Sequence, residues 1–144
     1  PYYPSSAYRD DSPEERHRKF IEDWRAIFTA APAIDICAFQ DGSCSFHAEE
    51  YPTLELDRYV REVHELCREF KITMWNNIET FARNMPIRFP PTDWRILQRK
   101  MAIADPYVEK HITFEFSHFL SPNSIYPSAR TLYRRYREDI LGRP

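Results

Sequence analysis

Hydrophobic residues follow two patterns along this chain. In four stretches they recur at spacings of three and four, which is typical of amphipathic helices; these stretches are 12–31, 54–70, 93–105 and 127–141. In three other places they form short runs rich in β-branched and aromatic residues, which is typical of buried strands; these runs are 33–40, 72–78 and 111–117. The sequence therefore predicts four helices alternating with three strands.

The order of these elements predicts an α/β fold with parallel strands, because each strand is followed by a helix before the next strand begins. A complete (β/α)8 barrel takes about 250 residues, whereas this chain has 144. We expect a (β/α) barrel fragment, with residues 1–144 forming a single domain that corresponds to the carboxyl-terminal half of a barrel. The alternative is a small open parallel sheet that is complete in itself.

Composition narrows the function classes. The net charge is −2, and Lys and Arg are spread through the predicted helices, so we expect no nucleic-acid partner, which would need a clustered basic face. No apolar run is long enough to cross a bilayer, so we expect no membrane partner. The three cysteines form no CxxC pair, so we expect no metal site. The sequence has no phosphate-binding glycine motif, so we expect no cofactor. Cys37 and Cys67 are expected to be small buried residues of the core.

Alternation along the strands predicts which residues share a face. We expect Ile36, Met74 and Phe114, with their aliphatic neighbours at alternate positions, to pack against the helices. The opposite, mixed faces would then point into the barrel, and they carry the acidic residues.

Counted from Ile34 and from Ile72, Asp41 and Glu79 each come eighth, at the strand ends where barrel enzymes place their chemistry. If their strands are neighbours, the two carboxyl groups lie within several ångströms of each other, and two facing carboxylates are what glycoside hydrolysis requires. Glu115, fourth when counted from Ile112, is a third candidate. The alternative is that these acids pair with interior Arg or Lys, or lie in solvated loops. The candidate substrate-binding residues are Trp75, Tyr3, Asn77 and Gln40; the aromatic members could stack on a sugar, or equally fill the barrel and its rim.

Three segments resemble a family of glycoside-hydrolase-like TIM-barrel proteins, many of which are secreted bacterial proteins. They are Ile34–Gly42, Trp75–Phe81 and Phe114–Pro122. The resemblance covers nearly the whole chain and implies the last three strands of a barrel. It further implies that Glu79 is the nucleophile, that its partner acid lies on a strand outside this chain, and that the location is periplasmic or extracellular.

The leading hypothesis is a carbohydrate-active barrel of glycoside hydrolase type, with Glu79 and either Asp41 or Glu115 at the site. The other hypothesis is a non-catalytic carbohydrate-binding barrel, or a structural half-barrel that acts only in an assembly. Whether the chain is an enzyme stays open at this point. The expected partners are a carbohydrate and either the remaining half of the barrel or a second copy of the chain, because a sheet cut from a barrel has two unpaired edges.

Overall fold

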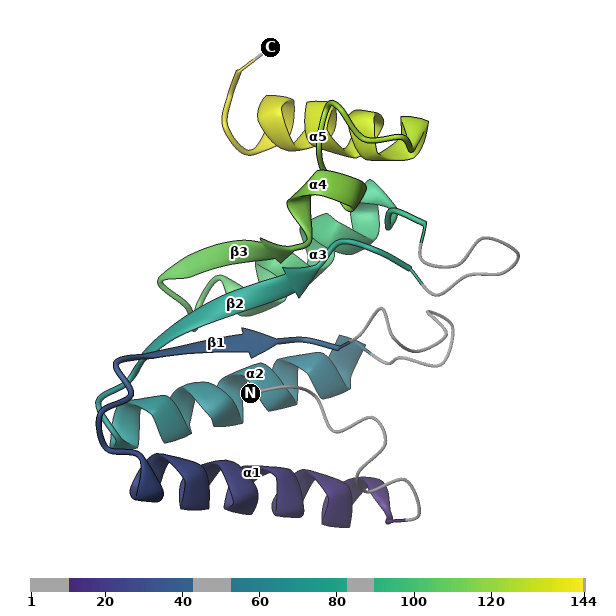
Figure 1. The fold of residues 1–144 in the computed structure, drawn as a ribbon. Helices are drawn as coiled ribbons and strands as arrows, with labels where there is room; N and C mark the ends of the chain where they lie inside the picture. The colour runs from purple at the N-terminus through teal and green to yellow at the C-terminus, as the bar shows by residue number, and fades with distance from the viewer. Residues whose placement is uncertain (1–10, 43–52, 83–89, 144) are drawn as a thin grey trace.

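A computed structural model of the chain describes residues 11–42, 53–82 and 90–143. Its elements follow one another along the chain as α1 (Pro13–Ala30), β1 (Ile36–Gln40), α2 (Thr53–Glu69), β2 (Thr73–Glu79), α3 (Trp94–Ala104), β3 (Lys110–Phe114), α4 (Phe116–Phe119) and α5 (Pro127–Asp139). The strands form one parallel sheet in the order β1-β2-β3 (Figure 1). The predicted α/β class with three parallel strands is confirmed.

Local sequence fixes where the long helices begin. Ser12 caps α1, since its Oγ accepts a hydrogen bond of 3.2 Å from the backbone N–H of Glu15, and Pro13 occupies the first turn, where its missing N–H costs nothing. Asp93 caps α3 in the same way by accepting a 2.8 Å bond from the N–H of Arg95. Both starts agree with the pattern of the sequence.

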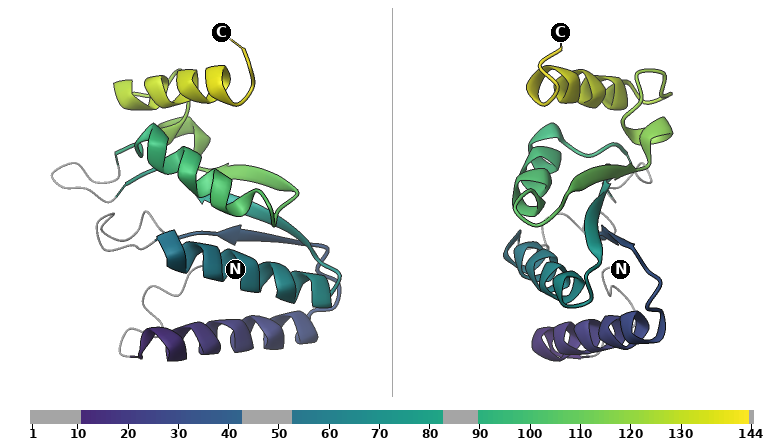
Figure 2. Two further views of the ribbon diagram at one scale, coloured as in Figure 1. Left: turned by 180° about the vertical axis from the view of Figure 1, so that it is seen from behind. Right: turned by 90° about the vertical axis from the view of Figure 1, so that its left-hand side faces the viewer.

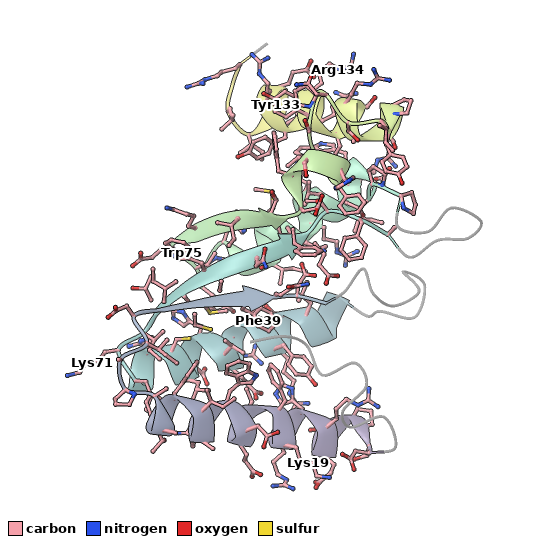
Figure 3. All side chains as sticks on the ribbon, viewed as in Figure 1. Lys19, Phe39, Lys71, Trp75, Tyr133 and Arg134 are labelled. Carbon is pink, nitrogen blue, oxygen red and sulfur yellow. The ribbon has the colours of Figure 1, made fainter. Side chains whose placement is uncertain are left out.

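The sheet is covered on one face by α2 and α3, with α1 packed beside α2 (Figure 2, right). The main core lies between these helices and β1 and β2, and includes Phe28, Phe39, Val63 and Met74. Figure 3 places Phe39 on the α2 side of β1. A smaller core joins Ile78, Leu97, Leu120 and Leu132.

The predicted faces are right for β2 and wrong for β1 and β3. Met74 and Ile78 are buried on the helix side, as expected, but on β1 the buried residues are Cys37 and Phe39, while Ile36 is 45% exposed. In β3, Phe114 is the register partner of Glu79, so it shares the face opposite the helices. The reason is that β1 carries apolar residues at odd and even positions alike, so alternation could not tell which set the helices would cover.

The third strand is shorter than predicted. It ends at Phe114, and residues 116–119 form the short helix α4. Phe116 packs edge-on against Tyr133 of α5, with 6.1 Å between the ring centroids. The apolar run that predicted a strand to Ser117 therefore turns out of the sheet to meet α5.

Cys37 of β1 and Cys67 of α2 are free and buried in the main core, which confirms their structural placement. Contact with the Cys37 thiol and burial both raise the pKa of Cys67 above its ordinary value. Among the described residues, no helix has the length and apolarity that crossing a bilayer would need.

Candidate active site

The candidate acids gather where the parallel strands end. β1 and β2 are neighbours in the sheet, with Gln40 paired to Asn77. Asp41 and Glu79 therefore lie at the same end of the sheet, where the strands have their carboxyl ends (Figure 1). Glu115 directly follows Phe114, the β3 partner of Glu79. The expected shared end and neighbouring strands are both observed for Asp41 and Glu79. The catalytic role of these residues stays a prediction.

Glu79 is the last residue of the central strand, and its side chain is 0% exposed. Its Oε1 accepts a hydrogen bond of 2.9 Å from Nε2 of Gln40. The side-chain oxygen of Gln40, Oε1, in turn accepts a hydrogen bond of 3.4 Å from Nδ2 of Asn77. The two amides form a short chain that orients the carboxylate. Three of the sequence-predicted site residues, Gln40, Asn77 and Glu79, therefore meet at one point.

Asp41 lies on the same strand end but holds the backbone of Glu79 and pairs with a lysine. Its Oδ2 lies 2.9 Å from Nζ of Lys100 on α3 and accepts a 3.4 Å bond from the backbone N–H of Glu79. Nζ of Lys100 also donates a 2.7 Å bond to the carbonyl oxygen of Glu79. The expectation that the acidic residues point into the barrel is wrong for Asp41, which follows the alternation of Cys37 and Phe39, and these two residues pack against the helices.

Two backbone features complete the end of these strands. Gly42 has a φ of 61°, a left-handed conformation that favours glycine and lets the chain leave the sheet directly after Asp41. Beyond Glu79, the N–H and the hydroxyl of Thr80 both donate to the carbonyl oxygen of Phe114, each at 3.0 Å. The peptide on either side of Glu79 is therefore anchored to a neighbouring element, which limits the movement of this residue.

Glu115 lies in a different environment. It is the residue before α4, and its Oε1 accepts a 2.9 Å bond from the hydroxyl of Ser117 and a close contact from Nδ1 of His118. Its side chain is 40% exposed. The network around Glu79 and the group around Glu115 share no hydrogen bond among those that the structure describes.

Trp75, one of the two aromatic candidates, is not brought to Glu79. Trp75 lies four residues earlier on the same strand, about 13 Å away at the usual rise per residue, and Nζ of Lys110 sits 4.5 Å from its ring centroid. Figure 3 shows Trp75 well away from the carboxyl ends of the strands. Tyr3 lies outside the described residues.

Lys100 is the member of the network that sequence reasoning missed. It is 4% exposed and shares the inward side of α3 with the buried Leu97 and Ala104. The spacing of three and four between these residues was the available signal, because a lysine in line with the apolar stripe of a helix calls for a buried partner.

One cavity in the described part of the chain lies away from these strand ends. It has a volume of about 470 Å³ and is lined by the α2–β2 turn and the loop before β3, including His64, Lys71 and Tyr107. Lys71 marks the end of the sheet opposite the strand carboxyl ends (Figure 3). The same ranges contain no group of three or more His, Cys, Asp or Glu side chains placed to hold a metal ion.

A search of curated proteins gave no match. Among solved structures, the chain is similar to a protein from Bacteroides thetaiotaomicron VPI-5482 whose crystal structure is described as that of a "putative alpha-L-fucosidase". The two share 39% sequence identity with a TM-score of 0.74, and the match covers 85% of this chain and 37% of that chain. This chain thus spans well under half of the larger protein. Together with the three parallel strands, the similarity supports a glycoside-hydrolase-like fold.

A family model described as a domain of unknown function, DUF4434, matches residues 5–126. The matched range includes every candidate site residue except Tyr3. The chain therefore belongs to the DUF4434 family.

Proposed function

We propose that the chain is a carbohydrate-active domain of glycoside hydrolase type, with Glu79 as its central carboxylate. The observation that carries the proposal is the geometry of Glu79, which ends the central strand with its side chain oriented by Gln40 at 2.9 Å. Barrel enzymes place catalytic residues at these strand ends. The description of the larger Bacteroides protein as a "putative alpha-L-fucosidase", at 39% identity, supports the same reaction class.

Glycoside hydrolysis needs two carboxyl groups, one that protonates the leaving oxygen and another that attacks the sugar or activates water. Glu79, held from three sides, has the fixed position that a nucleophile requires. Glu115 supplies the second carboxyl group. It directly follows the last residue of β3, and its side chain has solvent access for proton exchange. Asp41, which is ion-paired to Lys100, acts as a positioning residue by fixing the backbone of Glu79.

Substrate access is the step that this proposal must meet, because Glu79 has no exposed surface. Gln40 and Asn77, both partly exposed, are the polar groups that a sugar would reach first. A sugar hydroxyl that replaces Gln40 as the hydrogen-bond donor to Glu79 would bring the reacting carbon to the carboxylate. Gln40 therefore has two roles here: it orients the carboxylate in the free protein and binds the sugar in the complex.

A second function is favoured by the same burial. If Glu79 and Asp41 serve only to tie β1, β2 and α3 together, the chain is a non-catalytic carbohydrate-binding or structural unit. The 2.9 Å contact between Asp41 and Lys100 fits this reading, because a buried carboxylate needs a partner in any role.

The experiment is hydrolysis of a panel of aryl glycosides, including an aryl α-L-fucoside, by the wild-type chain and by Glu79→Gln. The amide keeps the shape of the carboxylate and removes the nucleophile, so we expect turnover to fall by at least about 10³-fold with sugar binding retained. Glu109→Gln, which changes an exposed carboxylate before β3, is the matched control and should keep full turnover.

Unchanged turnover in Glu79→Gln would remove Glu79 from the mechanism. A wild-type chain that binds sugars by calorimetry and hydrolyses none of the panel would favour the non-catalytic function. In that case Glu79→Gln should change the free energy of unfolding and leave sugar affinity unaltered.

A further inference from the structure

The cavity at the amino ends of the strands has the size of a small-molecule site. Its volume of about 470 Å³ falls within the range that is usual for ligand pockets. The turn between α2 and β2 and the loop before β3 both line it, and Lys71 marks its place in Figure 3. The whole length of β2 separates this end of the sheet from Glu79, about 20 Å at the usual rise per residue. The cavity is therefore separate from the candidate active site.

Part of the lining is apolar and aromatic. Ile72 and Met74, which are 8% and 4% exposed, both line the cavity. The rings of His64 and Tyr107 also line it, and they contact each other with 5.7 Å between their centroids. Apolar and aromatic surface beside a few polar groups is what small-molecule sites have in common.

The charged residues of the lining carry more positive than negative charge. Arg68 in the last turn of α2 and Lys71 just after it supply two cations, and Glu109 is the one acid among the lining residues. The side chains of Arg68 and Lys71 make no ion pair or hydrogen bond with the described part of the chain. By contrast, Arg58 and Arg61, earlier on α2, each pair with an acid. Two cations without a protein partner therefore line the same concave surface.

A simpler explanation of these cations is that they offset the partial negative charge at the end of α2. The last carbonyl groups are already bonded, however. That of Cys67 accepts a 2.8 Å bond from the N–H of Ile72, and that of Arg68 accepts a 3.2 Å bond from the N–H of Lys71. Lys71 also has a φ of 59°, a conformation that glycine adopts more readily. The chain thus places a lysine side chain at the cavity where glycine would suit the backbone better.

Three features of the lining define the class of ligand. The excess of positive charge favours an anion, and the fork of N–H donors on Arg68 matches a carboxylate. The apolar and aromatic surface favours an organic ring over a bare ion. Thr73 and Tyr107 add hydroxyl groups to the lining, and neither hydroxyl has a hydrogen-bond partner among the described residues. These hydroxyl groups can bind hydroxyl groups of a ligand.

We propose that this cavity binds a small hydroxylated carboxylate of the sugar-acid class. Arg68 and Lys71 pair with the carboxylate, Thr73 and Tyr107 bind ring hydroxyl groups, and the aromatic surface covers one face of the ring. Arg68 and Lys71 are exposed in the free protein, so added salt weakens the binding. This binding is independent of the proposed hydrolysis, because Glu79 lies at the other end of β2.

The test is a titration of the ¹⁵N-labelled chain with D-glucuronate, followed by amide chemical shifts in NMR spectra. We expect saturable shifts at the amides of the cavity, including those of Thr73 and Tyr107. Two matched probes divide the ligand into its parts. D-Glucose keeps the ring and lacks the carboxylate, whereas acetate keeps the carboxylate and lacks the ring. Each should bind at least about tenfold more weakly than D-glucuronate, because each loses one set of contacts.

Arg68→Gln and Lys71→Gln should each weaken the binding of D-glucuronate at least about tenfold, because each removes a charge-assisted bond to the carboxylate. Arg61→Gln is the matched control. It removes the same charge from an exposed position about two turns earlier on α2, outside the cavity lining, and should leave the affinity unchanged. Circular dichroism checks that the variants fold.

Four results would overturn the proposal. They are the absence of saturable shifts, shifts confined to the carboxyl ends of the strands, equal affinity for D-glucuronate and either matched probe, and an effect of Arg61→Gln as large as that of Arg68→Gln.

Discussion

The ammonium group of Lys100 lies 2.9 Å from Oδ2 of Asp41, and both side chains are almost completely buried, at 5% and 2% exposure. The pair joins α3 to the end of β1, and through the backbone of Glu79 it also holds the end of β2. Three elements that are far apart in the sequence are therefore fixed to one another by a single lysine. Loss of either partner should therefore loosen all three elements.

Lys100→Met should lower the free energy of unfolding by about 3–5 kcal/mol, because it leaves the Asp41 carboxylate buried without its cation. Urea unfolding followed by circular dichroism measures the change. Lys19→Met is the matched control, since Lys19 pairs with Asp11 at the surface with 37% side-chain exposure, and it should cost less than about 1 kcal/mol.

The double variant Asp41→Leu with Lys100→Met separates the pair from the rest of the network. Replacing a buried ion pair by apolar residues of similar size is often neutral or stabilising, so the double variant should recover most of the stability lost in Lys100→Met. A double variant less stable than Lys100→Met alone would show that Asp41 acts through contacts other than the lysine.

Phe39 and Ile36 test the corrected faces of β1. Phe39→Ala removes a ring that is 0% exposed in the main core and should lower the free energy of unfolding of the isolated chain by about 3–5 kcal/mol. Ile36→Ala, on the same strand but on the face away from the helices, where Ile36 is 45% exposed, should cost less than about 1 kcal/mol. Equal losses in urea unfolding would mean that the two faces are equally buried in solution.

The local sequence predicts the types of the main helices and strands, but not which face of every strand packs against the helices. The helix starts at Ser12 and Asp93 depend on short-range capping, which the sequence displays directly. The inward set on β2 was also legible, because polar residues such as Asn77 alternate there with Met74 and Ile78. On β1, apolar residues stand at both parities, so the choice between Ile36 and Phe39 is made by the docking of α2, which no local pattern contains.

The site was predictable in its position and less so in its partners. Asp41 and Glu79 could be placed at strand ends by counting along each segment. Lys100 could not be joined to Asp41, because the pairing depends on how α3 lies across the sheet. Glu115 was misplaced within its strand because the run before it has strong strand preference, while the contact between Phe116 and Tyr133 turns the chain into α4.

Glu14 gives a prediction that depends on pH. Arg58, which donates two hydrogen bonds of 2.8 Å to it, lowers the pKa of this carboxyl below its ordinary value. A lowered pKa in the folded state contributes stability above the unfolded-state pKa, and this contribution is lost as the pH falls through the folded-state pKa. Glu14→Gln should therefore lower the urea midpoint at pH 7 and make no difference once the carboxyl is protonated in both states. Asp139→Asn, an exposed carboxylate outside the ion pairs of the described residues, is the control and should shift the midpoint little at either pH.

Lys71 links α2 to β2 with a φ of 59°, in the left-handed region where a side chain costs about 1–2 kcal/mol. The turn is closed by bonds from the N–H of Ile72 to the carbonyl of Cys67, at 2.8 Å, and from Lys71 to Arg68, at 3.2 Å, which is the kind of helix end that glycine favours. Lys71→Gly should raise the free energy of unfolding by up to about 1 kcal/mol, since the relief of strain exceeds the extra freedom that glycine gives the unfolded chain. Lys71→Val, whose branched Cβ fits this conformation worst, should lower it instead. Thermal unfolding of the two variants beside the wild type measures both changes, and a Lys71→Gly chain less stable than wild type would show that the lysine side chain makes a compensating contact.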